Sequence, residues 1–265
     1  MAKIIIVAFS IALCGGMCAW GKDEKSPPGG SIQATASSNA RAMDIMREAQ
    51  KRFLAAKTYR IIYRKQGGKM IGGGSASFDL SLKRNGKSGV SFSQTAKMGP
   101  LEMRQIANHG KFYQLKPGDE NEAVRMKFAE DGNSDVIAQY FTDAGTVEKM
   151  TETEVAYRIR YRFSDADRKQ MAASMKTLTG MELPPNLQPA IGEYVFSRPD
   201  IQPKEISFLN ATGQLVEKAF IDKLELDAPV DETKFNLPKG CSVKEAATFM
   251  EYMLIQQAWF SGLKR

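Results

Sequence analysis

Short segments in which apolar and polar side chains alternate recur along most of the chain, and this alternation constrains the fold more than any other feature. The pattern is clearest in residues 155–163, where every second side chain is apolar or aromatic. It also marks residues 59–64, 76–83 and 124–128. Successive side chains of a β-strand point to opposite faces, so the alternation predicts strands with one buried and one solvated face. Together with weaker segments, the pattern predicts about eight to ten antiparallel strands.

Other segments carry apolar residues at helical spacing instead: residues 39–56, 134–144, 165–178 and 243–263. Two of these helices follow residue pairs of the capping-box type, Ser164 with Asp167 and Ser242 with Glu245. Strands and helices do not alternate regularly, as a parallel α/β sheet would require. The chain is therefore predicted to be an α+β protein in which helices cover the inner face of a long antiparallel meander.

The N-terminus has the pattern of a secretory signal peptide. Lys3 precedes an apolar run over residues 4–13, and residues 19–21 fit a small-x-small cleavage site. The run is too short for a membrane span, which needs about 20 residues. We expect residues 1–21 to be removed, which lowers the formal net charge from +7 to +6 because Lys3 is the only charged residue among them. The mature protein would then be periplasmic.

A lipoprotein signal is the alternative interpretation, with Cys14 or Cys18 acylated, although bulky residues precede both cysteines. Residues 22–38 are rich in proline, glycine and serine, which indicates a flexible linker. Residues 39–265 then form one domain that ends in the helix predicted over 243–263.

The sequence contains no motif typical of an enzyme or a metal site. The single histidine, His109, lies in an Asn-His-Gly sequence typical of a turn. Cys241 is the only thiol left after cleavage; it precedes the predicted last helix, which would lower its pKa, unless it is a buried inert thiol. Asp165 and Asp167 are paired carboxylates, but they stand at a helix start, where acidic residues are usually structural. We expect no catalysis, no cofactor and no metal.

Basic residues form a stripe on the polar face of two predicted strands: Arg158, Arg160 and Arg162 on one, Arg60 and Arg64 on the other. The stripe could bind phosphate headgroups, an anionic glycan or an acidic partner. It could equally be a solvated outer face that prevents edge pairing. The positive net charge permits nucleic-acid binding, but no basic-aromatic recognition motif supports it.

Three segments carry a resemblance to the LolA-like periplasmic lipoprotein carriers and related half-barrel lipid binders. They are Asp-Leu-Ser-Leu-Lys-Arg at 79–84, Ile-Ala-Asn-His-Gly-Lys-Phe-Tyr at 106–113, and a closing Asp-Glu-Thr-Lys-Phe-Asn-Leu-Pro-Lys-Gly at 231–240. The sequence departs from the family at Asn85-Gly86, and residues 164–183 resemble an insertion. The resemblance implies a curved antiparallel half-barrel whose concave face is covered by helices.

The resemblance also implies a function. An apolar cavity under the helices would bind lipid or the acyl chains of a lipoprotein, without chemistry and as a monomer. Arg84 matches the family residue that holds partner or cargo near the cavity mouth. The expected lipid- or partner-binding residues are Arg84, Phe78, Leu80, Phe92, Met46, Phe53, Met171 and Met175. The alternative is an envelope sensor or assembly accessory of the same fold that acts through protein–protein contacts.

Overall fold

The computed structural model of the protein describes residues 36–67, 74–85, 89–127, 145–179, 182 and 184–262. The expected signal peptide, with Cys14 and Cys18, and the helix expected over 134–144 lie outside the described residues.

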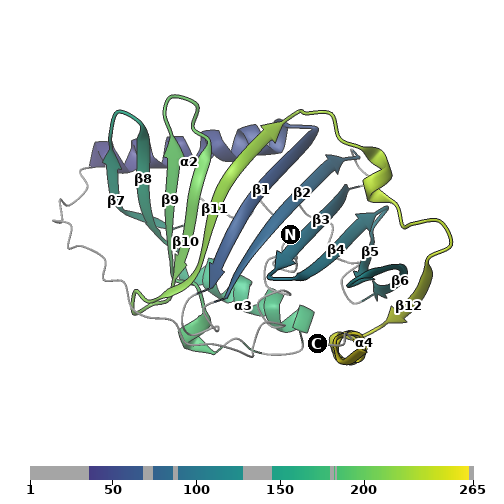
Figure 1. The fold of residues 1–265 in the computed structure, drawn as a ribbon. Helices are drawn as coiled ribbons and strands as arrows, with labels where there is room; N and C mark the ends of the chain where they lie inside the picture. The colour runs from purple at the N-terminus through teal and green to yellow at the C-terminus, as the bar shows by residue number, and fades with distance from the viewer. Residues whose placement is uncertain are drawn as a thin grey trace.

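Twelve strands of the described chain form one open, strongly curved sheet (Figure 1). Neighbours pair antiparallel except β12, which runs parallel to β6. The strands lie in the order β12-β6-β5-β4-β3-β2-β1-β11-β10-β9-β8-β7. Their bounds are β1 Thr58–Gly67, β2 Ser75–Arg84, β3 Val90–Met98, β4 Leu101–Asn108, β5 Lys111–Lys116, β6 Asp119–Met126, β7 Thr146–Glu152, β8 Ala156–Arg162, β9 Ile191–Ser197, β10 Pro203–Leu209, β11 Leu215–Leu226 and β12 Ser242–Ala246.

The pairing of β1 with β11 divides the sheet into two wings. The first wing contains β1–β6 with β12, and the second contains β7–β11. The α+β half-barrel prediction is confirmed, but with two strands more than the sequence indicated. The additional strands, β7 and β12, are the two edges of the sheet and carry mostly charged or exposed residues. Edge strands commonly carry charges, which conceals the alternation.

The turn between β4 and β5 explains the position of the single histidine. His109 and Gly110 have φ values of 49° and 76°, and Asn108 pairs with Lys111 on either side of them. A two-residue type I′ hairpin turn requires positive φ at both central residues. His109 is therefore a turn residue, as the sequence indicated.

In the described part of the chain, three α-helices accompany the sheet: α2 Ala36–Ala55, α3 Asp165–Thr179 and α4 Phe249–Gly262. Two short 3₁₀ helices, η5 Pro185–Leu187 and η6 Glu232–Phe235, lie in connections. Helix α2 crosses the second wing, α3 lies beneath the sheet, and α4 lies beside β6 and β12 (Figure 1). Because α2 begins at Ala36, the expected linker 22–38 extends too far by three residues.

One capping-box prediction is confirmed. The Asp167 backbone N–H donates to the Ser164 hydroxyl at 3.1 Å, and the Ser164 N–H lies 3.4 Å from the Asp167 carboxylate. These two bonds satisfy backbone groups at the start of α3 that the helix itself leaves unpaired.

The predicted helix over 243–263 begins too early. Ser242–Ala246 is strand β12, so Ser242 and Glu245 do not cap a helix. The capping box consists of Thr248 and Glu251: the Glu251 N–H donates to the Thr248 hydroxyl, and the Thr248 N–H donates to the Glu251 carboxylate, each at 3.2 Å. The two capping-box patterns lie six residues apart. The segment with Ser242 and Glu245 pairs with β6 as a strand, so the helix begins at the second pattern.

Candidate functional site: the inner face of the sheet

The inner face of the sheet is largely apolar in both wings. In the first wing, Tyr59 and Ile61 on β1 stand opposite Leu82 and Leu80 on β2, and all four side chains are buried. Phe92 on β3 continues the row from Leu82. The inward positions of β1–β3 therefore form a continuous surface of aromatic and aliphatic side chains.

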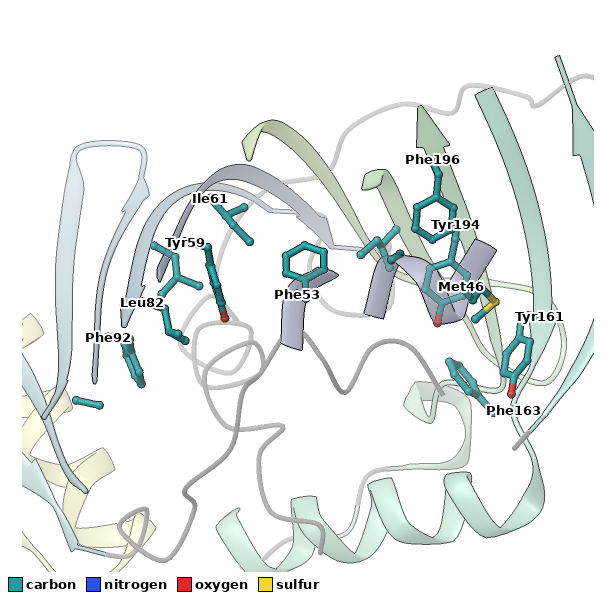
Figure 2. Packing of buried hydrophobic residues seen from close by; sticks show 14 of the residues in the cluster. Met46, Phe53, Tyr59, Ile61, Leu82, Phe92, Tyr161, Phe163, Tyr194 and Phe196 are labelled. Atoms are coloured by element: carbon teal, nitrogen blue, oxygen red, sulfur yellow. The ribbon is translucent and has the colours of Figure 1, made fainter. Parts of the chain in front are cut away.

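The second wing and α2 complete this surface. Buried aromatic residues lie on β8 and β9 and immediately after β8: Tyr157, Tyr161, Phe163, Tyr194 and Phe196. Figure 2 shows Met46 and Phe53 of α2 pointing inward between these aromatics and the side chains of the first wing. All of these residues belong to one hydrophobic cluster.

The predicted lining residues of the sheet lie on this inner side. Phe78 stacks on Tyr63 with ring centroids 4.7 Å apart, and Phe92 meets Phe112 edge to face at 5.8 Å. Phe78 belongs to a second cluster, with Ala96 and Met103, beside the main one. Leu80 lies in the main cluster.

The helices contribute the other predicted lining residues. Met46 and Phe53 are 2% and 1% exposed, and Phe53 packs edge to face on Tyr59 at 5.9 Å. Met171 of α3 is partly buried against the main cluster. The side chain of Met175 lies outside the described part of the chain.

Arg84 ends β2 on the same face as Leu82, so it stands at the rim of the inner face. Its guanidinium donates to the carbonyl of Ala56, directly after α2, and lies 5.7 Å from the centre of the Tyr59 ring. Burial lowers the pKa of Arg84, while Tyr59 and Asp227 act in the opposite direction. Arg84 therefore joins the end of α2 to the first two strands at the rim.

A rim pocket of about 710 Å³ opens next to this junction. The backbone N–H of Lys57 donates to the Asp227 carboxylate at 2.7 Å, and Lys83 pairs with Glu232. The rim pocket is lined by both apolar and charged side chains: Ala55, Lys57, Thr58, Lys83, Asp227, Ala228, Pro229, Val230 and Glu232.

The sequence interpretation missed a group of buried glutamines, here called the glutamine cluster: Gln94, Gln105, Gln114 and Gln256. The first three stand side by side on β3, β4 and β5. Alternation could have placed them, because Gln94 lies two residues from Phe92 and Gln114 two residues from Phe112. The alternating pattern does not mark these glutamines as buried, because it predicts apolar side chains at inward positions.

The glutamine cluster is only partly satisfied by the described residues. The Gln105 amide donates to Gln114 Oε1 at 3.1 Å, and Tyr252 of α4 donates to the same oxygen. The Tyr63 hydroxyl donates to Gln94 Oε1 at 3.4 Å. Gln94 Nε2 and both amide atoms of Gln256 are buried without a partner among the described residues. Each such atom costs about 1–3 kcal/mol relative to its hydrogen-bonded state in water.

Four of the five arginines in the stripe are paired with carboxylates of the sheet. Arg160 donates to Glu148 on β7 at 3.0 Å and to Glu193 on β9, and Arg162 also binds Glu148. Arg60 and Arg64 in the first wing have carboxylate partners too, Asp79 and Asp222. These contacts favour the interpretation as a solvated outer face over an anion site.

Of the two alternatives for Cys241, the structure favours the partly buried thiol over a thiol with a lowered pKa. A strand follows Cys241 instead of a helix, and burial raises its pKa, with Asp119 and Glu120 acting in the same direction. Of the paired carboxylates, Asp167 caps α3 and Asp165 binds Arg168 at 3.3 Å. The described residues contain no cluster of three or more potential metal-ligating side chains. None of the described helices has the length and apolar character that a membrane crossing requires.

No protein-family profile and no curated protein matches the chain. Solved structures with a similar fold include an uncharacterised conserved protein from Thermus thermophilus, at 12% identity and a TM-score of 0.45, covering 78% of this chain and 99% of that one. The Pseudomonas aeruginosa MucA/MucB complex matches at 12% identity and a TM-score of 0.44, over 77% of this chain and 63% of that one. A lipoprotein-sorting domain from Vibrio parahaemolyticus, described as putative, matches at 10% identity and a TM-score of 0.35, covering 75% and 97%.

Proposed function

We propose that this chain is an exported envelope protein that binds the acyl chains of a lipid or lipoprotein on the inner face of its half-barrel sheet. The binding is carrier-like and involves no chemical step. The observation that carries the proposal is the contrast between the two faces. The inner face is largely apolar in both wings apart from the glutamine cluster, whereas the outer face carries paired charges such as Arg60–Asp79.

Binding would be driven by removal of the guest from water. Each buried methylene contributes about 0.8 kcal/mol, so one acyl chain supplies enough free energy without a charged contact. Methionine side chains such as Met46 and Met171 adapt their shape easily, which suits guests of different length. Helix α3 would act as a lid, because Met171 is only partly buried against the main cluster.

The rim would be the entrance. The rim pocket lies where α2 ends, and Arg84 joins that end to β1 and β2. A guest that passes the rim would meet Arg84 before the apolar surface. The predicted signal peptide 1–21 would deliver the protein to the periplasm, as a free protein or anchored through Cys14 or Cys18.

Titration of the full chain with a fluorescent fatty acid tests this proposal. Met171→Lys places a charge on the proposed lid and lowers the affinity about fivefold or more, since it removes apolar contact area from the guest. The matched control is Lys169→Gln, an exposed position on the same helix, which leaves the affinity unchanged. Absence of saturable binding to the unaltered chain contradicts the proposal.

A second candidate function is that of an envelope sensor or assembly accessory. It is favoured by Met250 and Leu254, which lie one turn apart on α4 and are 65% and 61% exposed. Photo-crosslinking from position 254 in intact cells tests it. A single defined protein adduct that disappears in Met250→Glu supports this function, and the absence of any adduct counts against it.

A further inference from the structure

The glutamine cluster leaves three buried hydrogen-bonding atoms without a partner in the described residues: Gln94 Nε2, Gln256 Nε2 and Gln256 Oε1. Gln94 and Gln256 are each 1% exposed. Bulk water therefore does not satisfy these atoms. Since buried polar groups in proteins are nearly always hydrogen-bonded, an unpartnered set of this kind requires an explanation.

The contacts of α4 place Gln256 over the same part of the inner face as Gln94. Residues four apart on a helix share one face, so Tyr252, Gln256 and Phe260 lie in a row. Tyr252 donates to Gln114 on β5, and Phe260 packs against the cluster of Phe78, Ala96 and Met103 on β2–β4. Gln256 lies between these two anchors, above the central strands of the first wing.

The hydrogen-bonding partners of the cluster are neutral, and the charges beside them, Lys65 and Glu217, are paired with each other at 2.8 Å. The partners given by its hydrogen bonds are the hydroxyls of Tyr63 and Tyr252, the sulfur of Met103 and the glutamines themselves. Because Lys65 is already bound to Glu217, a buried carboxylate or phosphate would have to compete with Glu217 for the cation that offsets the loss of its hydration. The site therefore suits an uncharged polar group attached to an apolar chain.

We propose that Gln94 and Gln256 bind a secondary amide group of the guest, so that the ligand class is an N-acyl compound. The two amide nitrogens supply donors for the amide carbonyl, whose oxygen accepts two hydrogen bonds. Gln256 Oε1 supplies the acceptor for the amide N–H. This inference rests on the proposed function, because the acyl chain would lie on the apolar inner face and the glutamines would recognise its linkage.

Matched probes test the inference. N-methyldodecanamide, methyl dodecanoate and tridecane have similar apolar chains, but only the amide offers both an acceptor and a donor. Each is used to displace bound 1-anilinonaphthalene-8-sulfonate from the full chain. The amide should bind about tenfold more tightly than tridecane, with the ester between them, as expected when a buried site loses its hydrogen-bonding ligand group.

Variants assign this preference to residues. Gln94→Met and Gln256→Met keep the side-chain length and remove the amide, so each should reduce the preference to about twofold. Gln105→Met is the control, because the Gln105 amide nitrogen is already bonded to Gln114, and it should retain the preference. The melting temperature of Gln94→Met should change little, because the substitution removes an unpartnered buried donor but also the acceptor of the Tyr63 hydroxyl.

The outcomes separate the two proposals. Equal affinity for amide and tridecane overturns this inference and leaves acyl-chain binding intact. An amide preference that persists in both Gln94→Met and Gln256→Met also overturns it and makes the glutamines structural. Failure of all three probes to displace the dye overturns the proposed function and this inference with it.

Discussion

At the scale of single residues, polar side chains connect elements that the apolar core alone would not fix. Glu122 of β6 accepts hydrogen bonds from Lys116 on β5 at 2.9 Å, from Lys244 on β12 and from the Trp259 indole of α4 at 3.1 Å. These bonds hold the pKa of Glu122 at about 2, below its usual value. One carboxylate thus joins four elements at the edge of the first wing.

Substitution of Glu122 by glutamine should lower stability in a pH-dependent way. The pKa of Glu122 is lower in the folded than in the unfolded protein, so its contribution is full above about pH 4.5 and is lost as pH falls toward 2. Glu122→Gln should cost about 1–2 kcal/mol at pH 7, a value reduced for partial solvent exposure. Urea unfolding at pH 7 and pH 3 measures both effects.

The control for this prediction is Glu102→Gln. Glu102 pairs with Lys97 at 2.9 Å, but both side chains are more than half exposed. Such pairs contribute little, so this variant should stay within about 0.5 kcal/mol of the unaltered chain. Equal losses in the two variants, or a loss at Glu122 that does not shrink at pH 3, would refute the role given to Glu122.

At the scale of elements, local sequence and strand pairing compete at the C-terminus. Thr248 and Glu251 cap α4, whereas Ser242 and Glu245 carry a similar signal but lie in β12. We expect Thr248→Ala to cost about 1 kcal/mol, because it removes an N-cap. Urea unfolding followed by far-ultraviolet circular dichroism measures the loss. Ser242→Ala is the control and should change little; a larger loss at Ser242 would show that the helix begins there.

Most elements could be predicted from alternation, and the failures have physical causes. The strands with a clear apolar face, such as β1, β2 and β8, follow the pattern because one face is buried. The edge strands β7 and β12 do not, because they carry few apolar side chains. The helical period cannot decide where α4 begins, because that depends on the parallel pairing of β12 with β6.

The candidate site divides in the same way. Phe78, Leu80 and Phe92 follow from alternation within their strands, and Arg84 from the family resemblance. Alternation places Gln94 and Gln114 on the inner face, but the alignment of Gln94, Gln105 and Gln114 in a row depends on the register of three strands, which only the structure gives. The contribution of Gln256 depends on the docking of α4, to which no local pattern refers.

At the scale of the whole molecule, the sheet is open and its inner face is largely apolar, as the proposed binding of a guest requires. The two wings meet at β1 and β11, and α2 lies across the second wing so that its Met46 and Phe53 reach the space between them (Figures 1 and 2). Acyl-chain binding at this surface would need neither a metal nor a reaction, and its strength would follow the apolar area buried.

Native mass spectrometry of the full-length gene product, exported and isolated from the cell envelope without delipidation, tests this account most directly. We predict a species heavier than the polypeptide by the mass of one lipid or acylated molecule, and acyl chains in the organic extract of that species. A spectrum that contains only the bare polypeptide, from a preparation that also fails to bind a fluorescent fatty acid, would contradict it.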